Sequence, residues 1–514
     1  MGQFRYDAII IGAGHNGLVC ASYLAQAGLS VVVLERLERT GGAIVGESIH
    51  PGFQVPYCPY VCHMFQGKVI EELDLTRHGY ATYRYDPMAF QPFPDGSYLM
   101  SWHDDEQTRE GIRRLSERDA RAFPAWNHFW ERAAGILYRY FFTEPPTFAQ
   151  VTAEVRGTPD EEVWETMLTV GVRDLLDLYF EDERVKAFFV EAQDMGDPSA
   201  PGSVFSAAYI MWTRRFNKPE YFGIPKGGMN AVAAALTGAA QAAGAEIRTG
   251  TSVEQVLVEE GEARGVRLTG GEEIHGRVVV SNADPKRTYL NLVDSQSLDD
   301  NFVRRIANLR TRANCVKFLA ALSDLPDFSR YLGAGYDPQL TTYVRICPSV
   351  EYFQASWDAC KQGQPGTHPL IRMQIPSLWD PSLAPPGQHV VSCWTLYYPR
   401  HPVGESWQEA SGRVAESIIS TMCEYAPNFR DVLITWTLRT PEDIESSIGM
   451  TDGNIRHIDV VPSQALSRRL AYRSPIPRFY LCGAGTHPGG EITGAPGHNC
   501  AQAILRDVGQ EQPR

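Results

Sequence analysis

Apolar runs long enough to cross a bilayer are missing from this sequence of 514 residues. The longest, such as Ala8–Ile11 and Val278–Val280, have the length of strands, whereas a membrane-spanning helix needs about 20 apolar residues. No charged segment with an apolar core precedes Ala8, so we expect no secretory signal, and no Arg- and Ser-rich transit segment is visible. We therefore predict a cytoplasmic protein, for which peripheral membrane contact through an apolar patch stays open.

Basic residues are in the minority. The chain has 47 Lys and Arg against 61 Asp and Glu, a formal net charge of −14. An acidic surface repels phosphate backbones, so we expect no nucleic-acid partner. Internal repeats and low-complexity segments are also missing. The 43% hydrophobic and 21% charged residues exclude a disordered chain, a collagen and a coiled coil, and the length favours two domains.

The ten cysteines lie too far apart in this long chain to form a small disulfide framework. Cys58 and Cys62 have a C-x3-C spacing, but no matching Cys or His pair lies nearby in the sequence. We therefore predict buried thiols and no metal site.

The first strong motif is a β-α-β unit with G-x-G-x-x-G at its first turn. Gly12 permits a tight turn, Gly14 lets the backbone approach a pyrophosphate, and Gly17 lets the helix pack close to the sheet. The N-terminus of that helix offers N–H groups and partial positive charge to phosphates. The order along the chain is strand Tyr6–Ile11, glycine loop Gly12–Gly17, helix Leu18–Gln26 and strand Ser30–Leu34.

The second strand of this unit ends in Glu35, 18 residues beyond Gly17, where a carboxylate can accept hydrogen bonds from a ribose diol. Together with the glycine loop, this residue predicts an adenine-dinucleotide site. Arg36 follows and is a conceivable reader of a 2′-phosphate, but Glu35 disfavours NADP. Arg36, Gly41 and Gly42 join the predicted cofactor-binding residues.

A second glycine segment, near the C-terminus, favours FAD over NAD. Strand Phe479–Cys482 ends at Gly483 and Gly485, where a ligand can approach, and a helix Ala495–Arg506 follows. FAD is long enough for its flavin end to reach a second helix N-terminus, which would stabilise the negative charge of the reduced flavin. The remaining cofactor-binding residues predicted here are Ile492, Thr493 and Gly494.

The sequence resembles the phytoene desaturase-like flavoproteins, within the wider amine oxidase and GDP-dissociation-inhibitor fold group, and especially the branch named as pyridine nucleotide-disulphide oxidoreductase domain proteins. The resemblance implies non-covalent FAD, two domains, and redox chemistry on a small, usually apolar or amine substrate. It also implies that the Val253 backbone meets the adenine. The segments that carry it are Ile9–Gly17, Glu35, Gly41-Gly42, Gly223–Met229, Val278–Pro285 and Gly483–Gly497. No second G-x-G-x-x-G follows a strand, which disfavours a reductase fed by NAD(P)H.

We predict an α/β fold with a three-layer, Rossmann-like FAD-binding domain built discontinuously from residues 1–50, 223–290 and 465–514. Residues 51–222 and 291–464 form a mixed α+β substrate-binding domain with a largely antiparallel sheet that covers the flavin. The patterns predict helices at 119–138, 160–178 and 229–243, and strands at 245–248, 253–259, 263–268, 273–281, 315–322, 340–346 and 389–397.

Three residues are catalytic candidates. Lys317 interrupts the apolar strand Cys315–Leu322, which is costly unless its surroundings are polar or functional. By resemblance it falls near the lysine that holds a water at flavin N5 in amine oxidases; the alternative is a lysine that points to solvent.

Glu491 departs from both related families, where an aromatic residue or a glycine stands. It is either a general base or cation-binding group, or a surface residue favoured by a helix N-terminus. His487 is either a proton shuttle or a loop histidine that bonds the backbone. Lys226 is assigned to phosphate or loop structure. The aromatic residues Trp394, Tyr397 and Tyr398 line a substrate cavity or belong to the core.

Three functions remain open at this stage. The first is an FAD-dependent oxidase or dehydrogenase, similar to a desaturase, that transfers a hydride from an apolar or amphipathic substrate to flavin N5, with oxygen or a quinone as electron acceptor. The second is a redox-neutral isomerase or hydratase that uses reduced flavin. The third is a non-enzymatic protein that binds a lipid or prenylated partner; the intact glycine loop argues against it.

Overall fold

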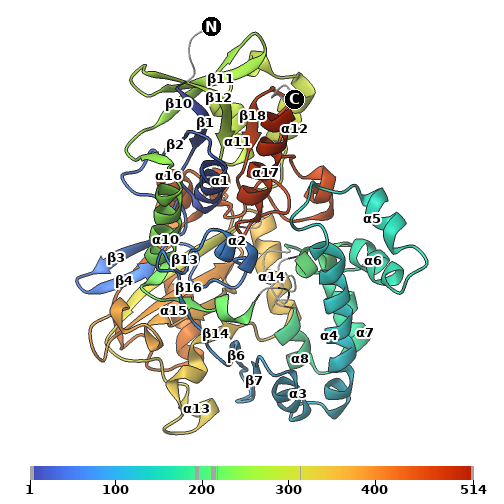
Figure 1. Cartoon of the computed structure of the whole chain (residues 1–514). Coiled ribbons are helices and arrows are strands. Elements are labelled where there is room, and N and C mark those ends of the chain that lie inside the picture. Colours follow the sequence, from blue (N-terminus) through green and yellow to red (C-terminus); the bar gives the residue numbers. More distant parts are fainter. Residues whose placement is uncertain (1–4, 191–195, 210–215, 217, 313, 511–514) are drawn as a thin grey trace.

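The computed structural model describes residues 5–190, 196–209, 216, 218–312 and 314–510. Two large sheets organise this part of the chain. The sheet that contains β1 lies at the top of Figure 1, the second sheet lies below it, and helices α3 to α8 gather beside the second sheet. Of the helices in these ranges, none combines the length and the apolar composition that crossing a bilayer requires.

The first sheet has a parallel centre with an antiparallel extension. β1, β2, β9, β12 and β18 pair in parallel, and β10 and β11 extend the first half of β12 as an antiparallel meander. Within the described residues its strands are β1 (Tyr6–Ile11), β2 (Val31–Leu34), β9 (Glu246–Arg248), β10 (Val253–Glu259), β11 (Glu262–Leu268), β12 (Glu273–Ser281) and β18 (Phe479–Leu481).

Both faces of this sheet are buried. Consecutive residues of a strand point to opposite faces, so the continuous apolar runs in β1 and β2 place apolar side chains on both. Ile10 and Val33 pack with α1 (His15–Gln26), α10 (Gly228–Ala242) and α17 (Ala495–Gln510). The neighbouring Ile9 and Val32 point the other way, toward β11 and α12 (Asp300–Ala307). The predicted three-layer arrangement is therefore confirmed.

Two close approaches fix α1 and α17 against the sheet and against each other. A Cβ atom on Gly17 would lie 2.2 Å from the Gly12 carbonyl oxygen, and one on Gly497 would lie 2.3 Å from the Asn16 carbonyl oxygen. Only glycine fits at such distances. The C-terminal helix is thereby held beside the N-terminal glycine loop, although about 480 residues separate them in the sequence.

The second sheet runs in the order β17, β13, β16, β15, β14, β6, β7 and is antiparallel except where β14 meets β6. This confirms the predicted, largely antiparallel sheet. One face packs on α15 (Trp407–Tyr425). The strands are β6 (Ala89–Pro92), β7 (Tyr98–Ser101), β13 (Cys315–Leu322), β14 (Tyr343–Ile346), β15 (Leu370–Gln374), β16 (His389–Leu396) and β17 (Leu433–Arg439).

A helical lobe fills the region between β7 and α10. Its helices are α3 (Asp105–Arg113), α4 (Glu117–Tyr138), α5 (Phe148–Val155), α6 (Asp160–Thr169), α7 (Val172–Tyr179), α8 (Glu183–Phe189) and α9 (Ser203–Ala207). The prediction of one helix over 160–178 is wrong. Gly171 is extended there and lies against the carbonyls of Pro198 and Ser199, so the chain breaks into α6 and α7.

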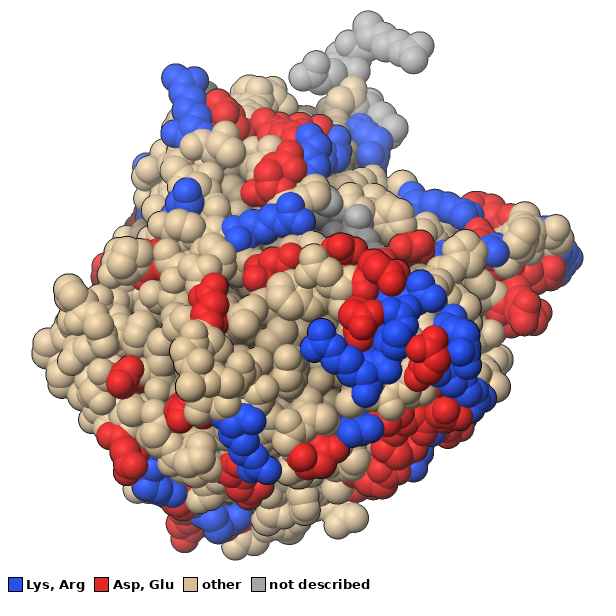
Figure 2. Space-filling model, turned by 90° about the horizontal axis from the view of Figure 1, so that it is seen from below, with Lys and Arg blue, Asp and Glu red and all other residues tan. Residues whose placement is uncertain are grey.

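Figure 2 shows the molecule from below, where acidic and basic side chains alternate on the right and a broad area on the left carries few charges. Ion pairs such as Arg113–Glu117 and Arg173–Glu351 come from this lobe and its border. This face therefore offers no continuous basic surface.

Shorter elements connect the sheets. They are the hairpins β3 (Gly46–His50) with β4 (Phe53–Pro56) and β5 (Thr82–Tyr83) with β8 (Ile224–Pro225), and the helices α2 (Gly67–Glu72), α11 (Pro285–Arg287), α13 (Ser329–Leu332), α14 (Val350–Lys361) and α16 (Pro441–Ile448).

The two sheets draw their strands from the two predicted sets of segments. The first sheet uses residues within 1–50, 223–290 and 465–514, and the second uses residues within 51–222 and 291–464. β3 begins before residue 50, yet its hairpin packs through Phe53 and Val55 on Leu319 of the second sheet. The exact domain boundaries stay a prediction.

Candidate active site

The carboxyl ends of β1 and β2 open into a cavity of about 180 Å³, here called the glycine-loop cavity. Gly12, Gly14, Gly42 and Val253 line it. α1 begins directly after Gly14, so the positive end of its dipole lies at this cavity. The crevice outside the carboxyl ends of parallel strands is where doubly wound sheets bind ligands.

Glu35 presents its carboxylate to this cavity. The residue is 6% exposed, and the two oxygens accept hydrogen bonds from the backbone N–H groups of Ala13 at 2.8 Å and Leu37 at 2.9 Å. A carboxylate has about four lone-pair positions, so acceptor capacity remains for a ribose diol. One backbone N–H from the glycine loop and one from two residues beyond Glu35 therefore hold this side chain at the cavity.

Arg36 also lines the cavity and ties it to a distant segment. Its Nη2 donates to the Ser447 carbonyl oxygen at 2.5 Å, and Arg287 Nε donates to the Gly449 carbonyl oxygen at 2.8 Å. Burial, followed by the charge of Arg287, lowers the pKa of Arg36. The end of α16 therefore closes one side of the cavity.

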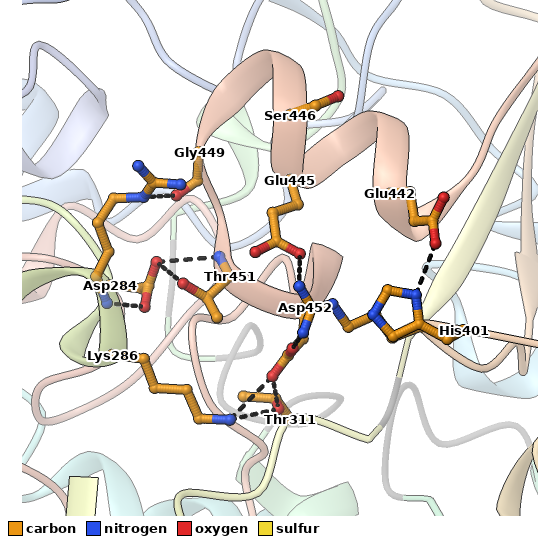
Figure 3. A network of polar contacts seen from close by, with 12 residues as sticks. Asp284, Lys286, Thr311, His401, Glu442, Glu445, Ser446, Gly449, Thr451 and Asp452 are labelled. Atoms are coloured by element: carbon orange, nitrogen blue, oxygen red, sulfur yellow. Dashed lines mark hydrogen bonds and ion pairs between the residues drawn. The ribbon is translucent and has the colours of Figure 1, made fainter. Parts of the chain in front are cut away.

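A polar network holds that segment in place (Figure 3). Asp284 accepts hydrogen bonds from Thr451 N at 3.0 Å and Thr451 Oγ1 at 2.8 Å. Lys286 Nζ lies 2.9 Å from Asp452 Oδ2, and Arg400 Nη1 lies 2.7 Å from Asp452 Oδ1. Because Asp284 and Lys286 follow β12 while the other groups come from residues 400–452, the network joins the regions of the two sheets.

A second cavity, of about 100 Å³, lies against the first. We call it the aromatic cavity, because Tyr60, Tyr85, Phe222, Tyr343 and Trp394 line it. The two cavities share part of their walls, namely His15, Ala43 and Ile455. The far end of a long ligand in the glycine-loop cavity would therefore lie next to the aromatic cavity.

Lys317 lies in the wall of the aromatic cavity. Along β13 the side chains alternate, so Phe318 packs toward α15 while Lys317 points to the opposite face. It is 2% exposed, its Nζ donates to Ser392 Oγ at 2.7 Å, and it lies 4.4 Å from the centre of the Tyr60 ring. Burial lowers the pKa of Lys317 to about 8. The alternative of a lysine that points to solvent is wrong.

Glu491 also lines the aromatic cavity, where it forms an ion pair with Arg456. Burial by itself raises the pKa of Glu491, but the charges of Arg456 and His63 outweigh burial and lower it below its ordinary value. The carboxylate is therefore ionised at neutral pH. Arg456 was missed in the sequence, because no motif marks it and only the fold brings it to Glu491.

His15 is a second residue that the sequence analysis did not single out. It lies in the shared wall, and its Nε2 donates to the Glu491 carbonyl oxygen at 3.2 Å. Burial and the charge of His457 lower the pKa of His15 to about 4, so the ring is neutral at physiological pH. Its position inside the G-x-G-x-x-G motif was the available signal.

His487 lies apart from both cavity walls. Its Nε2 donates to the Tyr140 carbonyl oxygen at 2.8 Å, and burial lowers its pKa to about 4. This placement agrees with the alternative interpretation, a loop histidine that bonds the backbone, and gives no support to a proton shuttle.

The remaining predicted cofactor residues surround the two cavities. Gly41 N donates to the Ala13 carbonyl oxygen at 2.8 Å, which joins the two N-terminal glycine segments. Gly483 and Gly485 flank Ala484, which lines the glycine-loop cavity. Before α17, Ile492 lines the aromatic cavity, Thr493 is fully buried and Gly494 has a φ of +73°.

Of the other aromatic and basic candidates, some line a cavity and others lie elsewhere. Trp394 lines the aromatic cavity, whereas Tyr397 and Tyr398 belong to the hydrophobic core. Lys226 lies over the Tyr83 ring at 4.8 Å. Cys58 lines the aromatic cavity, and the described His, Cys, Asp and Glu residues form no group of three or more that could hold a metal ion.

The donor set fits an adenine dinucleotide that carries a flavin. A buried carboxylate and a helix N-terminus face the glycine-loop cavity, as ribose and pyrophosphate require. The aromatic cavity adjoins it at His15, so a group at that end of the glycine-loop cavity would lie beside the contents of the aromatic cavity.

Known proteins share both sequence and fold with this chain. Residues 17–322 match the family described as flavin containing amine oxidoreductase. Pyridine nucleotide-disulfide oxidoreductase domain-containing protein 2 of Rattus norvegicus is 32% identical, over 98% of this chain and 94% of the rat protein. A limonene dehydrogenase component of Castellaniella defragrans is 27% identical, over 98% and 95%. The crystal structure of an oxidoreductase from Methanosarcina mazei shares the fold, with a TM-score of 0.65 at 18% identity over 97% and 99%.

The family match covers more than half of the chain, and the rat protein aligns with nearly all of it. The two-cavity geometry, the dinucleotide donor set and these relatives lead to the same assignment. The chain belongs to the flavin containing amine oxidoreductase family and is an FAD-dependent oxidoreductase.

Proposed function

We propose that this enzyme removes a hydride from a small apolar or amphipathic organic substrate bound in the aromatic cavity. The observation that carries the proposal is the shared wall at His15, Ala43 and Ile455, through which the aromatic cavity adjoins the glycine-loop cavity. A substrate in the first and the far end of a dinucleotide in the second are therefore neighbours. Oxygen or a quinone is the proposed electron acceptor.

The FAD would be held without a covalent bond. Glu35 would bind the ribose, the N-terminus of α1 the pyrophosphate, and the Val253 backbone the adenine. The residues before α17, Ile492 to Gly494, would lie at the flavin end. FAD held in this way would supply the acceptor for a hydride from a substrate C–H bond, and the protein would supply orientation and electrostatics.

Lys317 is the proposed proton carrier of the site. A pKa of about 8 leaves a fraction of its amine neutral near physiological pH, which suits a group that takes up or holds a proton. Ser392 fixes Nζ through its hydroxyl oxygen, and the Tyr60 ring lies beside it. We propose that Nζ orients a water at the reacting atom of the substrate.

Glu491 and Arg456 set the charge of the cavity. As an ion pair they contribute little net charge, and the hydrogen bond from His15 holds the Glu491 backbone, which has a φ of +69°. An isomerase or hydratase that used Glu491 as a proton donor would need a neutral carboxyl group. The lowered pKa of Glu491 disfavours that alternative.

The lining of the aromatic cavity supports an apolar substrate. Five aromatic rings and side chains such as Ile44, Met64 and Ile492 surround it. Such a surface gains from the removal of apolar groups from water. The name of the limonene dehydrogenase relative, which refers to a hydrocarbon, points to the same substrate class.

The test is the visible spectrum of the purified protein, followed by anaerobic addition of amines, apolar alcohols and terpene hydrocarbons, and then by air. We expect flavin bands that bleach with a substrate and return with oxygen or a quinone. Release of the flavin on acid precipitation would show that it is not covalently bound. A protein that stays without flavin after incubation with FAD would refute the proposal.

A further inference from the structure

A third cavity, of about 120 Å³, lies between the β3–β4 hairpin and the start of α10. We call it the outer cavity. Its wall contains the apolar side chains of Val55, Ile224, Met229 and Leu383. Other lining residues, such as Asn230, are exposed, so the cavity opens toward the surface.

Tyr60 is the connection between this cavity and the active site. It lines both the outer cavity and the aromatic cavity. Its own side chain is buried, with 6% exposure, and its ring lies 4.4 Å from Lys317 Nζ. The Tyr60 side chain therefore contacts both the outer cavity and the region of the proposed reacting position.

The volume of the aromatic cavity limits the size of the substrate that it can hold by itself. A closed apolar cavity of about 150 Å³ holds one benzene molecule. The aromatic cavity measures about 100 Å³, so a substrate larger than a few carbon atoms extends beyond it. The outer cavity offers a further 120 Å³ on the other side of Tyr60.

The two cavities also differ in charge. The aromatic cavity includes Lys317, Arg456 and Glu491, which suits the reacting end of a substrate. Among the described residues that line the outer cavity, the Tyr60 phenol is the one ionisable group. An uncharged chain is removed from water there without leaving a charged side chain desolvated.

We propose that the outer cavity is a second substrate subsite, which holds an apolar chain attached to the reacting group, and that Tyr60 controls the passage between the two. The substrate is then an amphipathic molecule with one reactive polar end and one hydrocarbon tail. This inference rests on the proposed function, because it assigns the aromatic cavity to the reacting group.

The experiment titrates the FAD-bound protein with straight-chain primary alcohols from butan-1-ol to dodecan-1-ol and follows the shift of the flavin absorbance bands. Each methylene that enters an apolar site strengthens binding about fourfold. We expect this increase to continue past the length that the aromatic cavity holds and to stop when the outer cavity is full.

Leu383→Phe fills part of the outer cavity. The increase should then stop about two methylenes earlier, with binding of the longest alcohols about 15-fold weaker and that of butan-1-ol unchanged. Val55→Leu, a smaller addition, should give a smaller shift in the same direction. The matched control is Leu378→Phe, because Leu378 lies outside the walls of the three cavities. Flavin content reports whether each variant is folded.

An identical chain-length profile in wild type, Leu383→Phe and Val55→Leu would overturn the subsite. So would a wild-type affinity that does not rise beyond butan-1-ol, or an absence of any shift. The proposed function fails by a different result, namely no bleaching of the flavin by any substrate. The two failures are distinguishable because binding is measured without turnover.

Discussion

The glycine-loop cavity and the aromatic cavity touch each other, yet they are built in different ways. The first takes a large share of its lining from two short segments that carry the glycine motifs, residues 11–16 and 34–43, and later segments such as 251–253, 282–284 and 448–450 complete it. The second is made of side chains from segments far apart in the sequence, such as Tyr60, Lys317, Trp394 and Glu491. The glycine-motif part of the first cavity depends on local backbone conformation, whereas the lining of the second depends on how distant segments pack together.

The first prediction concerns a substitution that disrupts the glycine loop beside the glycine-loop cavity. Gly17→Val places a side chain where even a Cβ atom would lie 2.2 Å from the Gly12 carbonyl oxygen, so α1 must move away from the sheet. We expect the free energy of unfolding to fall by at least the ~1–3 kcal/mol that overpacking usually costs. We also expect nearly complete loss of bound flavin. Flavin absorbance per protein and thermal unfolding measure both.

Gly412→Ala is the matched control, because a Cβ atom at Gly412 meets no other atom within 4 Å and the residue lies inside α15. Its flavin content should be unchanged and its stability should rise by about 0.5–1 kcal/mol. Full flavin content in Gly17→Val would contradict the tight contact between α1 and the sheet.

The second prediction breaks the ion pair of the aromatic cavity. Arg456→Met leaves the Glu491 carboxylate buried without this partner, so the free energy of unfolding should fall by about 3–5 kcal/mol. Arg456→Met with Glu491→Gln should lose less than the sum of the two single changes. Urea unfolding of all four proteins gives the coupling energy, and strict additivity would contradict the pair.

The same pair has a defined pH dependence. Because the folded-state pKa of Glu491 lies below its ordinary value of 4.5, the stabilisation is fully present above 4.5 and is lost as the pH falls through the folded-state value. The double variant should therefore lose less stability in acid than the wild type. An equal loss of stability in acid for the double variant and the wild type would show that Glu491 does not cause this pH dependence.

The third prediction separates chemistry from stability at Lys317. Lys317→Met should lower the rate of flavin reduction about 100- to 10,000-fold, the range for loss of a positioned acid or base. In the wild type this rate should rise as the pH passes through about 8, where the amine loses its proton. Stopped-flow reduction across a pH series measures both, and a flat profile would count against the role.

Lys317→Met should lower the rate of flavin reduction but raise the stability of the fold. The folded-state pKa of Lys317 lies below the ordinary 10.5, so the buried ammonium destabilises the wild type below pH 8, and stability recovers as the pH rises from about 8 to 10.5. Lys317→Met should therefore be more stable at pH 7, by about 2–3 kcal/mol. Lys361→Met, at an exposed position on α14, should change neither rate nor stability by more than about 0.5 kcal/mol.

The smallest effect is expected at Glu35. Glu35→Gln replaces a charged acceptor by a neutral one, so the affinity of the apoprotein for FAD should fall about tenfold, while the fold is kept by the backbone contacts around it. Titration of apoprotein with FAD measures it, with the exposed Glu38→Gln as control. Unchanged affinity would show that Glu35 does not contact the cofactor.

Much of the fold could be predicted from local patterns. The strand β13 follows from a short, nearly continuous apolar run and the Ala-rich helix α10 from helix propensity, and their bounds match the prediction to within one residue. The single helix expected over 160–178 failed at Gly171, because a close approach to residues 198 and 199 breaks it. That contact has no local signal.

At the site, Glu35 and Lys317 could be recognised as candidates, one from a motif and the other from a charge inside an apolar strand. The role of Glu491 was left open between an acid–base group and a surface residue. Its ion pair with Arg456 decides its ionisation, and that pair joins residues 35 positions apart on irregular loops. Tyr60 was missed as a cavity residue for the same reason, whereas His15 had a local signal in its position inside the glycine motif.

The sequence by itself indicated the glycine loop, Glu35 as the candidate ribose-binding carboxylate and the cofactor class, since the motif behind them depends on backbone conformation over short stretches. The tertiary structure decided which side chains meet at the reacting position, because burial, charge pairing and cavity size arise only when distant segments pack together. Lys317 acquires its pKa of about 8 in that packed state alone.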